Sequence, residues 1–273
     1  MSSPPEYVMT RDYIDNNRIN LQHYLSREIF GYLTHPTIPT TASGLRVADI
    51  GTGTGIWLSD LASRVPKDAK LDGLDVSFDA VPPKALLPSN VSLYNWNIKE
   101  AVPKELAGVY DVVHVRHFSF VLQDHEIEQV LTNLYELLKP GGYLQWTEPD
   151  VASFRVEKGD SGDESDVMIQ LIKASQTQDK RLIPTWVPKM PAQFKACGLS
   201  DIVADVREAS GDIGLAMHEC NLTLHEIIAR QTQNKEVAQR ISDLMPKVCR
   251  ATRNGAYIAF TRWTVVGKKA IVS

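Results

Sequence analysis

The chain has 273 residues, 43% of them hydrophobic, and a formal net charge of −4 at pH 7. This length and composition are sufficient for one domain with a full hydrophobic core. The slightly acidic balance gives no electrostatic reason to expect a nucleic-acid partner. The three cysteines include no C-x-x-C pair, which favours free thiols in a reducing compartment over a disulfide framework.

The N-terminal segment predicts a cytoplasmic protein with a helical arm. Its first residues have no cationic stretch followed by an apolar one, as a signal peptide would. No apolar run in the chain approaches the ~20 residues of a membrane-spanning helix. From about residue 10 to residue 33, apolar side chains recur at helical spacing. We therefore expect residues 1–40 to form a helical arm that covers the ligand site of the main fold.

The next part of the chain alternates strands with helices, which is typical of a parallel α/β sheet. The clearest helix is predicted over residues 124–138, where apolar side chains line one face and Pro140 and Gly141 follow. Strands are expected near residues 45–50, 70–75, 91–96, 110–115 and 142–148.

After residue 150 an acidic loop over residues 156–166 interrupts this alternation. Helices near 165–179, 191–198 and 213–252 are then expected, with strands at 201–207 and 260–267. The predicted organisation is one domain with a core over 41–150, a cap insertion and helix over 151–200, and further strands with a helical insertion over 201–273.

The most informative segment joins an apolar strand to a helix through alternating glycines, Gly51, Gly53 and Gly55. Glycines allow a sharp turn and a close approach of the backbone to a nucleotide-like ligand. A dinucleotide fingerprint would need glycine where Ile56 stands, and Asp49 would repel a pyrophosphate on the turn. A cofactor with positive charges and no phosphate, such as S-adenosylmethionine, suits this turn better.

Four further segments follow the glycine motif in order, at residues 71–75, 94–98, 110–114 and 138–144. Together with the motif, they resemble the class I S-adenosylmethionine-dependent methyltransferases. The resemblance covers residues 8–150, and in texture it is similar to fungal secondary-metabolism methyltransferases. It implies a Rossmann-like α/β fold: a seven-stranded, mostly parallel sheet with an antiparallel last strand and helices on both faces.

The resemblance also implies which residues bind the cofactor. Asp49 would order the glycine turn and balance the ammonium group. Asp75 would accept hydrogen bonds from both ribose hydroxyls, with Asp72 as the competing acid earlier in the strand. Asn97 stands where the family usually has an acid for the adenine amino group. The full predicted set is Asp49, Gly51, Thr52, Gly53, Gly55, Asp75, Val76, Asn97, Ile98 and Arg116.

Residues for the methyl acceptor are predicted at the ends of strands and in the insertions. His117, just beyond the fourth strand, is either a general base or substrate contact, or a structural histidine. Glu148, Trp186 and His218 are candidate substrate contacts, with surface or core positions as the alternative. No metal site is predicted, because His114 and His117 have no third ligand at a recognisable spacing.

Together, these expectations predict that the protein transfers a methyl group from S-adenosylmethionine to a small molecule. A phenol or carboxylate oxygen is the preferred acceptor atom, and a nitrogen is the alternative. A second alternative is a regulatory or binding protein that keeps the methyltransferase fold. A dinucleotide-dependent oxidoreductase is disfavoured by Ile56 and Asp49. The sequence predicts no nucleic-acid or membrane partner and leaves the oligomeric state, including a homodimer, open.

Overall fold

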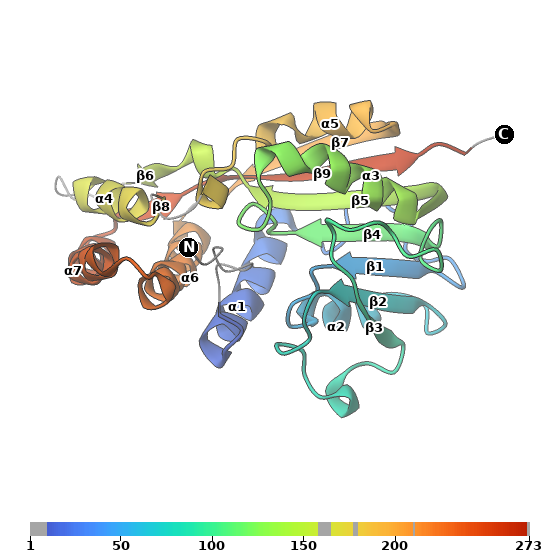
Figure 1. The fold of residues 1–273 in the computed structure, drawn as a ribbon, viewed down its shortest axis with the longest axis horizontal. Helices are drawn as coiled ribbons and strands as arrows, with labels where there is room; N and C mark the ends of the chain where they lie inside the picture. Colours follow the sequence, from blue (N-terminus) through green and yellow to red (C-terminus); the bar gives the residue numbers. More distant parts are fainter. Residues whose placement is uncertain (1–9, 158–164, 177–179, 210, 272–273) are drawn as a thin grey trace.

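The computed structural model describes residues 10–157, 165–176, 180–209 and 211–271. Its centre is a seven-stranded sheet with the order β3-β2-β1-β4-β5-β9-β7 (Figure 1). Strand β9 runs antiparallel to its neighbours β5 and β7, and the other strand pairs are parallel. The predicted Rossmann-like sheet with an antiparallel last strand is confirmed. Its strands are β1 Arg46–Ile50, β2 Lys70–Asp75, β3 Val91–Asn95, β4 Tyr110–Arg116, β5 Leu138–Pro149, β7 Leu199–Glu208 and β9 Thr261–Lys269.

The central strands are buried because helices cover both faces of the sheet. Alternate residues of each strand enter different clusters: Val47 and Val112 pack with Trp57 and Leu58 of α2. Ala48 and its neighbours on the other face form a second cluster with the apolar side of α3. These flanking helices are α2 Ile56–Ala62, α3 Ile127–Leu137 and α5 Met190–Ala196.

The N-terminal helix α1 Tyr13–Phe30 begins at Asp12, whose carboxylate caps the first turn, and ends at Gly31 in the left-handed conformation. Its side chains Leu25 and Phe30 are buried, and the helix packs against α6 and α2. The described part of the predicted arm therefore includes a helix that packs against both the cap helix α6 and the helix α2 of the core.

A helical cap lies beyond the carboxyl ends of the parallel strands, on the left in Figure 1. It contains α4 Ser165–Gln176, α6 Gly211–Gln231 and α7 Lys235–Arg253, which share one apolar cluster. A two-stranded sheet, β6 Arg155–Glu157 with β8 Tyr257–Ala259, joins them and was not expected from the sequence. Residues 158–164 of the predicted acidic loop lie outside the described residues. Short 3-10 turns occur at Lys84–Leu86, Asp124–Glu126, Val151–Ser153, Lys180–Leu182 and Val187–Lys189.

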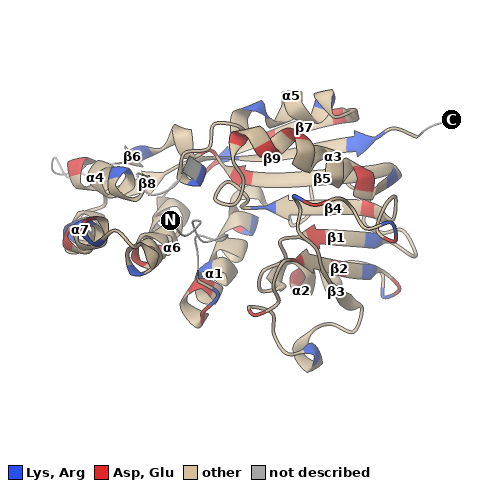
Figure 2. Ribbon diagram, in the orientation of Figure 1, with Lys and Arg blue, Asp and Glu red and all other residues tan. Residues whose placement is uncertain are grey.

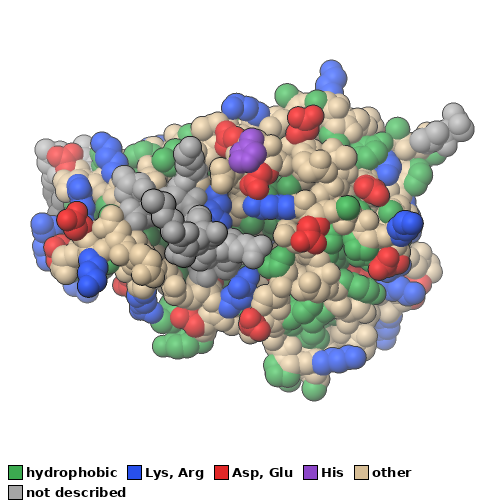
Figure 3. Space-filling model, in the orientation of Figure 1, with side chains coloured by type: hydrophobic (Ala, Val, Ile, Leu, Met, Phe, Trp, Pro, Cys, Tyr) green, Lys and Arg blue, Asp and Glu red, His purple; other side chains and the backbone are tan. Residues whose placement is uncertain are grey.

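The surface carries charges of both signs. Lys and Arg are interspersed with Asp and Glu along the ribbon (Figure 2) and over the described part of the face shown in Figure 3. Within the described ranges, no helix combines the length and the apolar character needed to cross a bilayer.

His218 of α6 is a structural residue of the cap, which corrects its predicted contact with substrate. The side chain is 1% exposed. The Thr252 hydroxyl donates to the Val248 carbonyl, so its oxygen accepts from Nε2 of His218 at 2.9 Å. The N–H of Ile258 donates to Nδ1 at 3.3 Å. This arrangement requires the neutral imidazole, and burial lowers the pKa of His218 to about 4.

We predict that His218 makes the cap sensitive to acid. The imidazole of His218 takes up a proton below pH 6.5 in the unfolded chain and only near pH 4 in the folded chain. The contribution of neutral His218 to the stability of the fold is therefore complete above pH 6.5 and is lost as pH falls toward 4. The change is at most about 3 kcal/mol. Urea unfolding between pH 4 and 7 should show a weaker pH dependence in His218→Gln. The exposed His125→Gln control should behave as wild type, and an unchanged slope in His218→Gln would contradict the assignment.

Candidate functional site

The glycine turn after β1 packs directly beneath the segment that follows β4. Gly51 has a φ of 66°, and a Cβ at this position would lie 2.5 Å from two ring carbons of Phe118. Its N–H donates to the carbonyl of Leu74 at 2.7 Å. Only glycine combines this left-handed backbone with the close approach of an aromatic ring.

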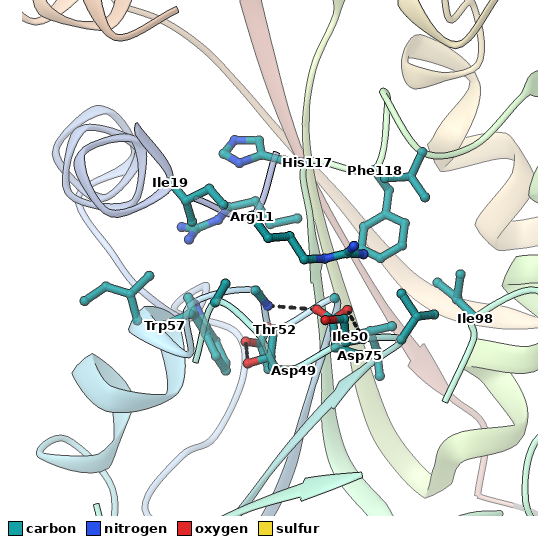
Figure 4. Close-up of a pocket in the computed structure, with 18 of the residues that line it drawn as sticks. Arg11, Ile19, Asp49, Ile50, Thr52, Trp57, Asp75, Ile98, His117 and Phe118 are labelled. Carbon is teal, nitrogen blue, oxygen red and sulfur yellow. Dashed lines mark hydrogen bonds between the residues drawn. The ribbon is translucent and has the colours of Figure 1, made fainter. Parts of the chain in front are cut away.

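Asp75 ends β2 beside this turn. One carboxylate oxygen accepts from the N–H of Gly53 at 2.9 Å and the other from the N–H of Ser77 at 3.3 Å (Figure 4). Each oxygen has a further lone pair for an additional donor. Burial raises the pKa of Asp75. The competing acid, Asp72, is buried and paired with Arg46 at 3.0 Å.

Asp49 holds the turn through both of its oxygens. Oδ2 accepts from the Thr52 hydroxyl at 2.8 Å, and Oδ1 lies 2.7 Å from Nδ1 of His114. The His114 ring is stacked on Trp57 with 3.8 Å between centroids. Burial lowers the pKa of His114. The carboxylate is thereby oriented between the glycine turn and strand β4.

A pocket opens above the turn, between the ends of β1, β2 and β4 and helix α1 (Figure 4). Its empty volume is about 1340 Å³, counting space open to solvent. Of the ten predicted cofactor residues, all but Gly55 line it. Gly55 instead precedes α2 as its N-cap, where its left-handed backbone starts the helix. We refer to this space as the cofactor pocket.

Helix α1 supplies a wall of this pocket that the sequence did not predict residue by residue. Asp15, Arg18, Ile19 and Gln22 line it. Their spacing of three and four residues is the repeat of one helix face, so a search for polar residues at that spacing could have found them. Asp15 pairs with Arg18 at 2.6 Å.

Arg116 joins the pocket to α1. Its guanidinium lies 3.1 Å from Nδ1 of His23. Nε2 of His23 in turn lies 3.1 Å from Asp60 of α2, which also binds Arg27 at 2.7 Å. Burial, followed by the charge of Arg116, lowers the pKa of His23 to about 4. The neutral His23 therefore connects three elements around the pocket.

His117 lies at the junction of the cofactor pocket and a second pocket. Its φ of 62° is a left-handed conformation that non-glycine residues rarely adopt. Burial and the charges of Arg116, Arg18 and Arg262 lower the pKa of His117 well below its usual value. This direction favours a neutral His117 over the general base that was one of the two alternatives expected from the sequence.

The second pocket, called the acceptor pocket below, lies under the helical cap. It shares the lining residues Gln22, His117 and Phe120 with the cofactor pocket, so the two spaces adjoin at these side chains. Its other walls come from β9 and from the cap helices α4 and α6.

Two more predicted substrate contacts, Trp186 and Glu148, line neither pocket. Trp186 is 1% exposed and packs on Trp146 in the core, with ring centroids 5.2 Å apart. Glu148 is 0% exposed. It accepts hydrogen bonds from the backbone N–H groups of Phe118 and Ser119, the Ser119 hydroxyl and the Trp146 indole. Both are corrected to structural residues. Burial raises the pKa of Glu148 to about 7.

In the part of the chain that the structure describes, no group of three or more His, Cys, Asp or Glu side chains is arranged to hold a metal ion.

Comparison with known proteins matches this geometry to a family. A family model described as a methyltransferase domain matches residues 21–195. The chain is 36% identical over 151 residues to methyltransferase grgD of a Penicillium species, which covers 53% of this chain and 50% of grgD. It is 32% identical over 148 residues to N-methyltransferase tcpN of Claviceps purpurea, covering 54% of this chain and 53% of tcpN. The chain thus spans about half the length of the curated relatives it matches.

Among solved structures, the fold is similar to that of phosphoethanolamine N-methyltransferase 2 of Haemonchus contortus in complex with S-adenosyl-L-methionine. The TM-score is 0.52 at 16% identity, covering 96% of this chain and 57% of that chain. At this identity the likeness shows the fold alone.

We predict that Glu148 fixes the turn carrying His117 and Phe118. In the wild type, the N–H donors around Glu148 face carboxylate oxygens. In Glu148→Gln, one of these oxygens is replaced by an amide NH₂, which cannot accept a hydrogen bond. Each buried donor left without a partner should lower the free energy of unfolding by about 1–3 kcal/mol. Urea unfolding measures this, with the exposed Glu128→Gln of α3 as control. A Glu148→Gln protein as stable as wild type would show that these hydrogen bonds do not hold the turn.

Proposed function

This chain belongs to the methyltransferase-domain family, and on that premise we propose that it transfers a methyl group from S-adenosylmethionine to a nitrogen atom of a small molecule. The single observation that carries the proposal is that the two pockets adjoin at His117, with Asp75 and the glycine turn lining the first of them. Of the two fungal relatives reported above, one is named an N-methyltransferase, which supports nitrogen as the methylated atom.

The residues of the cofactor pocket fit S-adenosylmethionine. Asp75 has lone pairs for two cis hydroxyls in addition to the backbone donors it already accepts. Gly53, which has no side chain, leaves room for the chain of the methionine moiety. Asn97 and the buried Ile98 line the pocket beyond Asp75, where an amide and a backbone N–H can bind adenine.

S-adenosylmethionine supplies a methyl group on a sulfonium: the S–C bond breaks as the N–C bond forms, S-adenosylhomocysteine leaves, and the nitrogen loses a proton to water. The contribution of the protein is to position the two reactants. The adjoining pockets would hold the two reactants at one junction, and holding two reactants in line accounts for a large part of such a rate enhancement. His117, neutral at the junction, can accept a hydrogen bond from the acceptor N–H.

The preference for nitrogen over oxygen differs from the expectation based on the sequence. A phenol must lose its proton to become a good nucleophile, and the lowered pKa of His117 makes it a weak base for that task. An unprotonated amine or ring nitrogen needs no prior deprotonation. A mass-based screen of phenols, carboxylic acids and amines tests this choice, and exclusive methylation of oxygen would overturn it.

For the cofactor, we predict that Asp75→Ala weakens S-adenosylmethionine binding by about tenfold or more, because two hydrogen bonds to a charged acceptor are lost. Calorimetric titration measures the affinity. The exposed Asp243→Ala of α7 removes the same charge far from the pocket and should bind as wild type. Equal affinities for all three proteins would remove Asp75 from the cofactor site. Binding without any methyl transfer in the screen would favour a regulatory or binding role.

For the junction, we predict that His117→Gly lowers kcat by about tenfold, because one hydrogen bond to the acceptor is lost, with little change in cofactor affinity. Glycine adopts the left-handed φ of this position freely, so backbone strain does not explain the loss. The wild-type rate should show no ionisation from His117 between pH 6 and 8. Unchanged turnover in His117→Gly, with His125→Gly as control, would limit His117 to a structural role.

A further inference from the structure

The acceptor pocket has apolar walls and one buried cation. Its apolar lining comes from the loop after β4, the cap and the residue that precedes β9, and includes Phe120, Ile172, Leu182, Leu224, Ile228 and Phe260. The polar groups beside them are neutral: Gln22 donates to Asn221 at 3.4 Å, and Ser175 lies 2.7 Å from Nδ1 of His225. Burial lowers the pKa of His225 to about 4, so it carries no charge near neutrality.

The cation is Arg262 of β9, which is 5% exposed and lines the acceptor pocket. Its guanidinium donates to the backbone carbonyl of Phe260 at 3.1 Å. Among the described residues, no carboxylate lies within ion-pair distance of it. A guanidinium has five N–H donors, and burial lowers the pKa of Arg262 only to about 10, so it stays charged.

Other arginines on the same sheet have the kind of carboxylate partner that Arg262 lacks among the described residues. Arg46 on β1 pairs with Asp72, and Arg207 pairs with Asp205. Arg207 lies directly opposite Arg262 in the β7–β9 register, with its side chain half exposed. A buried charge without a partner destabilises a fold, and because the described residues offer Arg262 no carboxylate, a bound ligand is the partner that we expect.

We propose that Arg262 binds a carboxylate of the methyl acceptor, so that the acceptor is a mainly apolar monocarboxylate. The proposal rests on the function proposed above for the joined pockets. A guanidinium binds a carboxylate through two parallel hydrogen bonds, and the neutral apolar walls suit the rest of such a molecule.

The carboxylate is an anchor and not the methylated group. Arg262 lines only the acceptor pocket, whereas Gln22, His117 and Phe120 line both pockets. The atom that receives the methyl group must reach this shared junction. A carboxylate paired with a guanidinium is also a weaker nucleophile, because its charge is neutralised. The product therefore keeps its free carboxylate.

Matched probes test the proposal without knowledge of the natural acceptor. We would titrate the protein, with S-adenosylhomocysteine present and absent, with 3-aminobenzoate against 3-aminobenzamide and indole-3-acetate against indole-3-acetamide. Each pair differs in charge and hardly in shape. Wild type should bind at least one carboxylate about tenfold more tightly than its amide. If neither carboxylate binds more tightly than its amide, the proposal is overturned.

Two substitutions separate recognition from folding. Arg262→Met keeps the unbranched apolar stem and removes the charge, so the preference for carboxylate should fall to about one while Tm stays equal or rises. Arg262→Lys should retain part of the preference. The matched control, Arg207→Met, should keep the whole preference. A preference that survives Arg262→Met, or an Arg262→Met protein that unfolds at a lower Tm than wild type, would assign Arg262 a structural role instead.

The same titrations distinguish this inference from the proposed function. If S-adenosylmethionine fails to bind while carboxylates remain preferred, the proposed methyl transfer fails and the Arg262 site stands. If S-adenosylmethionine binds and carboxylates are not preferred, the Arg262 assignment fails and the proposed function stands.

Discussion

The buried carboxylate of Glu148 holds in place the turn after β4, on which both pockets depend. Strand β5 carries it to the sheet end with no exposure to solvent, where it accepts from Phe118 and Ser119 in the turn after β4 and from the Trp146 indole. Those bonds fix a turn in which His117 is left-handed and the Phe118 ring lies over the glycine turn. The cofactor pocket and its junction with the acceptor pocket both depend on this single anchored turn.

Burial also determines how charge is distributed around the junction. The histidines at or near it are neutral, because desolvation lowers their pKa and nearby arginines add to the shift. The arginines stay charged, and each of Arg18 and Arg116 has a partner on α1. Arg262 is different, since it faces an apolar pocket with only a backbone carbonyl. Positive charge at this site is therefore available for an anionic part of a ligand.

The local elements of the core could be predicted because local patterns specify them. Strand β2 begins and ends where the sequence pattern predicted, and the glycine motif and Asp75 meet in one pocket. The strands β6 and β8 were missed because three residues are too few to show alternation. The fates of Glu148 and Trp186 could not be predicted, because a polar or aromatic residue at a strand end or in a loop faces core or pocket according to distant neighbours.

The role proposed for Arg262 could not be predicted from the sequence for the same reason. Its lack of a partner becomes visible only when β9 is placed between β5 and β7, which brings together residues more than 50 positions apart in the chain. Sequence spacing carries no information on such pairings. By contrast, the pocket face of α1 follows a helical repeat that the sequence does contain, at Asp15, Arg18 and Gln22.

A crystal structure of the chain with S-adenosylhomocysteine tests the central claim most directly. The account predicts that both ribose hydroxyls lie within hydrogen-bond distance of the Asp75 carboxylate and that the sulfur faces the junction at His117. A nucleoside bound outside the cofactor pocket, or a ribose turned away from Asp75, would contradict it.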